Sequence, residues 1–150
     1  MKKIFLSIVL VLAAGIGATF AQKSNTVSRY VQTSLIKNFS SAKDISWKET
    51  KNYDEATFTI DGQVLTAYYT GSQHPFAISR NIATTQLPMM LLGDIKRNYK
   101  DYWVSDLFEL MIDGHSEYYI TLERAGKQII LKSDDASQWT KYDTSTTTEI

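Results

Sequence analysis

The residues that could do chemistry are few and scattered along the chain. There are two histidines and no cysteine. His74 stands next to a proline, His115 falls in a predicted loop, and no HExxH or other paired spacing joins them to a metal site. Asp134 and Asp135 could offer oxygen ligands to calcium, but further ligands at fixed spacing are missing. We expect exposed loop histidines, a solvated turn at the aspartates, no metal site and no cofactor.

Nucleophilic and phosphate chemistry also lack sequence support. None of the serines lies in a GxSxG setting, and neither GxGxxG nor GxxxxGK[ST] occurs. Four glutamates could in principle form a carboxylate pair across a sheet: Glu49, Glu55, Glu109 and Glu117. Surface charge on strands is the ordinary explanation for glutamates at such positions. We therefore expect no catalytic residues and no enzyme. A hydrolase is a distant alternative that requires Asp134, His115 or a glutamate pair to converge in a pocket.

Residues 1–21 have the composition of a secretory signal peptide. Lys2 and Lys3 precede an apolar run from Ile4 to about Phe20, and small residues lead to a plausible cut after Ala21. The run is shorter than the roughly 20 residues that span a bilayer, which disfavours an uncleaved anchor. No cysteine is present for a lipoprotein signal. We expect a periplasmic or secreted protein without membrane insertion after cleavage.

The remaining chain is expected to form one domain over residues 22–143, followed by a polar tail over residues 144–150. Removing the two lysines leaves 14 basic and 16 acidic side chains, so the charge balance predicts no nucleic-acid partner. Without cysteine there are no disulfides, and the hydrophobic core alone must stabilise the fold.

Two similar stretches organise this domain. The first is expected to have a helix from Asn25 to Phe39, capped by Ser24 or Asn25, and then strands around Ile45 and Trp47, from Ala56 to Ile60, from Gln63 to Thr70 and near Phe76 to Arg80. The second starts with Pro88 and a helical stripe of Met89, Leu92, Ile95 and Tyr99, and strands follow to Tyr142. Matching element order and turn positions predict two α-β-β-β-β units, over residues 24–82 and 86–143.

Register predicts which side chains share a face. A two-residue Asp61-Gly62 loop places Ala56, Phe58, Ile60, Leu65, Ala67 and Tyr69 on one face, and Thr57, Thr59, Val64, Thr66 and Tyr68 on the other. In the second unit the same loop at Asp113-Gly114 would separate Phe108 and Leu110 from Tyr118 and Ile120. We therefore expect a bulge at Gly114, with His115 inside the loop, which brings all four to one face and leaves Tyr119 outward.

The aromatic residues divide into two groups by this register. Five are expected in the core because they alternate with polar residues: Trp47, Phe58, Phe76, Phe108 and Trp139. Tyr68 and Tyr119 are expected to point to solvent. An exposed tyrosine on a rigid sheet offers contact area with little entropy loss, so these two are candidate partner-binding residues.

The sequence resembles a family of periplasmic proteins of Bacteroidota described as PepSY-like and beta-lactamase-inhibitor-like. The likeness rests on a signal peptide ending in FAQ, the hairpin YDEATFTIDGQ, the Leu87-Pro88 pair before a helix and the hairpin EYYITL. It implies an α+β fold in which two tandem units form an extended antiparallel sheet with helices on one face. The family has no established catalytic residues to carry over.

Together these features predict a non-catalytic periplasmic protein-binding module. Its open sheet face would contact another periplasmic or envelope protein, in an inhibitor-like role toward an envelope peptidase or hydrolase. The alternative is a protein that binds a small ligand or a cell-envelope polymer in the crevice between helices and sheet.

Overall fold

A computed structural model describes residues 27–142, and the expected signal peptide and residues 144–150 lie outside this range. The described chain forms one eight-stranded antiparallel sheet whose strands pair in sequence order. The first unit contains α1 (Arg29–Asn38), β1 (Lys43–Glu49), β2 (Asp54–Ile60), β3 (Gln63–Tyr69) and β4 (Ala77–Asn81). A short 3-10 helix, η1 (Thr84–Gln86), leads to α2 (Met89–Asn98), β5 (Trp103–Ile112), β6 (His115–Arg124), β7 (Lys127–Ser133) and β8 (Thr140–Lys141).

Helix α1 begins later than the sequence pattern predicts. Its N-cap is Ser28, whose hydroxyl accepts a hydrogen bond from the Val31 amide at 3.3 Å. The expected start at Asn25, with Ser24 or Asn25 as the cap, is therefore wrong. Apolar periodicity extends beyond a helix whenever the preceding residue also packs on the core, and Val27 does so here. A cap is set by the residue that can satisfy free amide groups.

The first hairpin follows the predicted register. Ile60 pairs with Gln63, Phe58 with Leu65, and Ala56 with Ala67 across the Asp61-Gly62 turn. The left-handed conformations of Asp61 (φ 50°) and Gly62 (φ 80°) match a two-residue turn. Beneath α1 the hydrophobic core contains the residues predicted for this face, with Val31 and Leu35 from the helix and Ala56, Phe58, Ala67 and Tyr69 from the sheet.

Helix α2 follows Pro88 as expected, but it buries a different stripe. Met89 is 87% exposed, whereas Leu91 is fully buried and Leu92, Ile95 and Tyr99 pack partly against the core. The assignment of Met89 to the buried stripe is wrong. Met89 and Leu91 are two positions apart on the helix, which places them on different sides of it.

The second hairpin differs from the prediction. It has a two-residue turn at Asp113-Gly114, Ile112 pairs with His115, and Phe108 pairs with Tyr119. The expected bulge at Gly114 is absent, and the pairing shifts between Val104 and Asp106 instead. Phe108 and Leu110 therefore lie on the face opposite Ile120 and Leu122. Strands β5 and β6 are apolar on both faces, so no odd loop is needed to bury their side chains.

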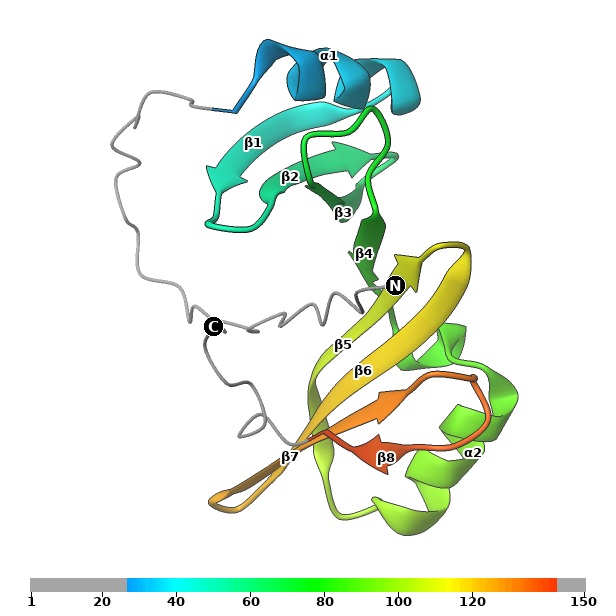
Figure 1. Ribbon diagram of the computed structural model, residues 1–150. Coiled ribbons are helices and arrows are strands. Elements are labelled where there is room, and N and C mark those ends of the chain that lie inside the picture. Colours follow the sequence, from blue (N-terminus) through cyan, green and yellow to red (C-terminus); the bar gives the residue numbers. More distant parts are fainter. Residues whose placement is uncertain (1–26, 143–150) are drawn as a thin grey trace, which may run out of the picture.

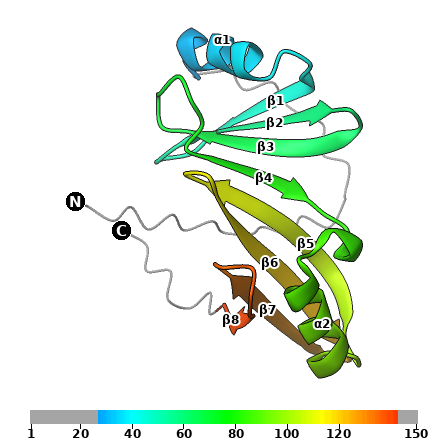
Figure 2. The ribbon, with the colours of Figure 1, turned by 90° about the vertical axis from the view of Figure 1, so that its right-hand side faces the viewer.

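Both helices lie on one face of the sheet. Paired residues share a face, which places Ala67 beneath α1 and Leu107, Ile120 and Leu131 beneath α2 on the same side. The sheet curves away from the helices, so that the upper and lower halves meet at an angle (Figure 1), and the perpendicular view shows α2 in front of its strands (Figure 2). We call the side without helices the open face, with reference to residues 27–142.

A polar row separates the two cores on the helix face. Arg80, Glu109, Tyr118 and Ser133 pair successively across β4, β5, β6 and β7. The Arg80 Nε donates to Glu109 at 2.7 Å, and the Tyr118 hydroxyl donates to the other Glu109 oxygen at 3.3 Å. This row marks the junction of the two units, each with its own hydrophobic core.

The order of one helix followed by four strands occurs twice, as the sequence predicts. That the two units are copies of one ancestral unit stays a prediction. Among residues 27–142, no helix is long and apolar enough to cross a membrane.

Candidate partner-binding surface

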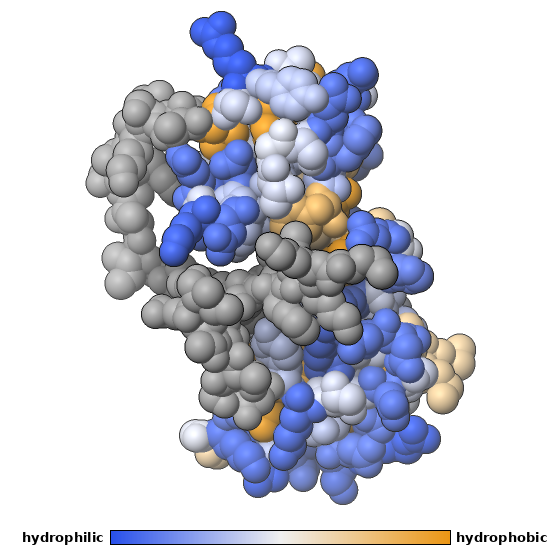
Figure 3. Space-filling view, viewed as in Figure 1, coloured by the Kyte–Doolittle hydropathy of each residue, from blue (hydrophilic) through white to orange (hydrophobic). Residues whose placement is uncertain are grey.

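Six aromatic side chains gather around the open face and come from both units. We call them the aromatic cluster: Tyr53, Tyr68, Phe76, Phe108, Tyr119 and Tyr142. Small and aliphatic side chains from β4 and β5 fill the space between the rings: Ala77, Leu110 and Ile112. A hydrophobic patch reaches the surface near the middle of the molecule, and other hydrophobic patches are visible beside α1 and at the lower end (Figure 3). The cluster is a second apolar surface of the sheet, apart from the two cores beneath the helices.

The upper part of the cluster surrounds Tyr68. The register prediction is correct in placing Tyr68 on the face opposite the helix, but Tyr68 is only 7% exposed, so its expected exposure to solvent is wrong. Tyr53 packs edge-on against its ring at a centroid distance of 5.6 Å, and Phe76 lies at 6.3 Å. The Tyr68 hydroxyl lies 3.2 Å from the Ser79 hydroxyl, which satisfies its polar end. Burial raises the pKa of Tyr68, so the phenol stays neutral.

The lower part of the cluster is centred on Tyr119, which is partly buried. Its ring stacks on Phe108 with a centroid distance of 4.9 Å and an interplanar angle of 7°. Tyr142 packs edge-on against its other side at 5.5 Å. The Tyr119 hydroxyl donates to Glu117 at 2.9 Å. Burial, with the neighbouring Glu117 carboxylate, raises the pKa of Tyr119 far above its ordinary value.

A charged group fixes the edge of this lower part. The Lys132 amine lies 3.2 Å from Glu117 and 2.6 Å from Asp134, and it also lies 5.5 Å from the centre of the Tyr119 ring. Burial would lower the pKa of Lys132, but the hydrogen bond to Asp134 and the nearby Glu117 raise it. Rigid rings held by charged neighbours lose little entropy on contact with a partner.

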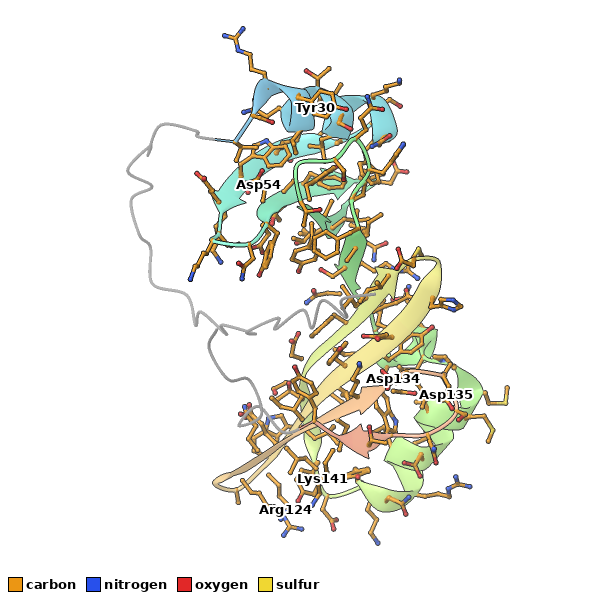
Figure 4. The ribbon with its side chains drawn as sticks, viewed as in Figure 1. Tyr30, Asp54, Arg124, Asp134, Asp135 and Lys141 are labelled. Carbon is orange, nitrogen blue, oxygen red and sulfur yellow. The ribbon has the colours of Figure 1, made fainter. Side chains whose placement is uncertain are left out.

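The residues considered for chemistry do not assemble into a site. His74 and His115 are both exposed, and within residues 27–142 no group of three or more metal-binding side chains is close enough to hold an ion. Asp134 pairs with Lys132, and Asp135 accepts hydrogen bonds from Ser137 (Figure 4). His115 begins β6 and is not part of a bulged loop, which corrects the expected position.

The four glutamates are also kept apart. Glu55 pairs with Lys48, Glu109 with Arg80 and Glu117 with Lys132, each with a basic side chain. Glu109 lies on the helix face, whereas Glu55 and Glu117 lie on the open face. Glu49 lies opposite Asp54 in the β1–β2 register, at the end of β1. None of these pairs joins two of the four glutamates.

Sequence reasoning missed most of the cluster. Tyr53 was hidden in the KNYD turn, and Tyr142 stands next to the expected tail. Alternation with polar residues predicts Phe76 and Phe108 in the core beneath the helices, but the structure places them with Tyr68 in the cluster. One signal was present: Phe108 and Leu110 fall on the face opposite Tyr118 and Ile120 if Asp113-Gly114 is read as a plain two-residue turn.

Solved structures confirm the fold. A BLIP-like protein from Bacteroides fragilis superposes with a TM-score of 0.66 at 21% identity, over 77% of this chain and 85% of that one. A DUF2874 family protein from Bacteroides uniformis superposes with a TM-score of 0.71 at 13% identity, over 81% of this chain and 92% of that one. A protein from Bacteroides eggerthii, for which a periplasmic location is proposed, superposes with a TM-score of 0.69 at 14% identity. The superposition covers 78% of this chain and 90% of that one.

The chain has the BLIP-like fold. The expected α+β architecture, an extended antiparallel sheet with helices on one face, is thereby confirmed. The PepSY-like part of the resemblance stays a prediction. No protein-family model and no curated relative matches the sequence.

Proposed function

We propose that the chain is a non-catalytic protein-binding module that acts in the periplasm or outside the cell. The observation that carries this proposal is the aromatic cluster, which gathers six rings on a sheet face that no helix of residues 27–142 covers. Aromatic residues are enriched at protein interfaces, where they supply much of the binding energy. The expected signal peptide and the periplasmic location proposed for the Bacteroides eggerthii neighbour support the location.

The structure changes which residues should contact the partner. Tyr68 is buried within the cluster, so we propose that it supports its neighbours from beneath. Tyr119 keeps its proposed role in contact, together with the partly exposed Tyr53 and Tyr142. The target class we propose is an envelope peptidase or hydrolase, which extends the BLIP-like description of one neighbour to this chain.

Matched variants test the proposed surface. We expect Tyr53→Ala/Tyr142→Ala to weaken partner binding by about tenfold or more, because each loss of about 1.4 kcal/mol in binding energy is a factor of ten. Tyr30→Ala on α1 is the control, since Tyr30 is 53% exposed and lies on the helix side (Figure 4). Partners captured from an envelope extract by the unmodified protein are purified, and their affinities for the three forms are measured by calorimetry.

The contact surface and the class of the partner are tested by different outcomes. Equal affinities of all three forms would exclude the aromatic cluster as the contact surface. If the cluster variant alone binds weakly, the purified partner is assayed for hydrolysis with and without the module. Unchanged hydrolysis at saturating module would reject the inhibitor-like role and leave the binding role in place.

The alternative of a ligand between helices and sheet has no comparable observation behind it. Two hollows of about 280 and 290 Å³ occur among the described residues, and neither is lined by a residue of α1 or α2. The one that includes Arg124 lies at the end of the molecule away from α1 (Figure 4).

A further inference from the structure

An exposed tryptophan stands in a hollow at the β6–β7 end of the sheet. Trp103, the first residue of β5, is 55% exposed. The hollow has a volume of about 290 Å³ and is lined by Trp103, Glu123, Arg124, Gly126, Lys127 and Gln128. Figure 4 places Arg124 at the far end of the molecule from Tyr30 on α1. Trp103 is the only apolar side chain in an otherwise polar lining.

Three of these side chains form one row on the open face. Trp103 pairs with Glu123 across β5 and β6, and Glu123 pairs with Gln128 across β6 and β7, so all three point to the same side. The Gln128 amide donates to a Glu123 oxygen at 3.1 Å, which orients both polar groups beside the indole. The row therefore combines a flat apolar ring with a fixed carboxylate and amide.

The charges around the row decide what ligand fits it. The Arg124 guanidinium lies 5.3 Å over the Tyr102 ring, and Tyr102 packs with the core beneath α2, so this cation is held toward the helix face. Arg124 and Lys127 in the lining still disfavour a cationic ligand, while Glu123 in the row disfavours an anionic one. What remains is a neutral ligand with an apolar face and several hydroxyl groups.

We propose that this hollow binds a neutral saccharide. A pyranose ring presents a face of C–H groups that can pack on the Trp103 indole. Its neighbouring hydroxyls can donate to the Glu123 carboxylate and hydrogen-bond with the Gln128 amide. A shallow site with one aromatic platform and a few fixed polar groups suits such a ligand. The site lies apart from the aromatic cluster, so this proposal does not depend on the proposed protein partner.

Spectroscopy of the tryptophans can test the site directly. The full chain is titrated with cellohexaose, maltohexaose and hexa-N-acetylchitohexaose, all of them neutral, while the indole N–H signals of its three tryptophans are followed by NMR. We expect at least one sugar to shift the Trp103 signal, assigned by its loss in Trp103→Ala, with dissociation constants in the millimolar range or tighter. Trp139, whose indole donates to the Leu91 carbonyl at 3.1 Å, should be unaffected.

Variants then define the contacts. Calorimetry should show affinity reduced about tenfold or more by Trp103→Ala and by Glu123→Ala. Tyr30→Ala, which removes an aromatic side chain of similar exposure on α1, should bind like the unmodified protein, and so should Tyr53→Ala/Tyr142→Ala. Thermal unfolding of each variant checks that it is folded. We expect this because Trp103 and Glu123 are not core residues.

Three results would overturn the proposal. The first is that none of the three sugars binds at concentrations up to about 10 mM. The second is that Trp103→Ala binds the sugar as well as the unmodified protein. The third is that a lysine oligopeptide binds in place of the sugars and loses affinity in both site variants, which would make the hollow a site for cations.

Discussion

At the scale of single residues, Phe58 tests the core beneath α1. Its side chain is 1% exposed and its ring lies 4.8 Å from that of Phe39. We expect Phe58→Ala to lower the free energy of unfolding by about 3–5 kcal/mol, because truncation of a buried aromatic side chain loses transfer energy and leaves a cavity. This is a large part of a total that is usually about 5–15 kcal/mol. Urea unfolding measures the difference.

Val64 on β3 is the matched control for Phe58. It belongs to the neighbouring strand but is 54% exposed on the open face. Val64→Ala should change the free energy of unfolding by about 0.5 kcal/mol or less. Equal losses for the two variants would contradict the assignment of the faces.

Glu109 makes stability depend on pH. Burial would raise the pKa of this carboxyl, but hydrogen bonds from Arg80 and Tyr118 and the Arg80 charge lower it below the ordinary value. Stability from a carboxyl of lowered pKa is present above the unfolded-state value and is lost as the pH falls through the folded-state value. Between about pH 5 and 3, the unmodified protein should therefore lose stability more steeply than Glu109→Gln.

At neutral pH the same variant should be less stable by about 1–3 kcal/mol, because the Arg80 guanidinium loses its charged acceptor. Arg80 is 41% exposed, so water compensates part of the loss. Chemical unfolding of both forms at several pH values measures how the free energy of unfolding changes with pH, and also its difference between the two forms at neutral pH. If the free energy of unfolding fell equally steeply with pH in both forms, Glu109 would not be held in its charged form by these contacts.

At the scale of elements, two glycines should respond in opposite directions. Gly93 lies within α2 with open space at its missing Cβ, so Gly93→Ala should stabilise the protein by about 0.5–1 kcal/mol. Gly114 has a φ of 81° in the β5–β6 turn, and Gly114→Ala should destabilise it by about 1–2 kcal/mol. Thermal unfolding distinguishes the signs. Stabilisation by Gly114→Ala would contradict the two-residue turn.

The two hairpins show how far the sequence determines an element. In the first, Thr57 and Thr59 alternate with Phe58 and Ile60, so one face is clearly polar and the register follows from the Asp61-Gly62 turn. In the second, apolar residues occupy both faces of β5, because α2 covers one and the aromatic cluster the other. Alternation then carries no information about register. A bulge at Gly114 would be needed only if β5 buried a single face, and β5 buries both.

At the scale of the whole molecule, the continuous sheet joins the two units. Strands β4 and β5 pair along Ala77 to Asn81, and the polar row of Arg80 and Glu109 crosses this junction. The aromatic cluster extends over the same junction, with Tyr68 from the first unit and Phe108 from the second. The proposed contact surface therefore exists only in a chain that contains both units. Its curvature and composition could not be predicted from either hairpin alone.

Site-specific photocrosslinking is the most direct test of the claim that the open face binds a protein. A benzophenone amino acid is placed at position 53, 142 or 30 in the intact protein, which is then irradiated in its own envelope. We predict the same protein adduct from positions 53 and 142 and none of that mass from position 30 on α1. An adduct from position 30, with none from positions 53 and 142, would contradict the account.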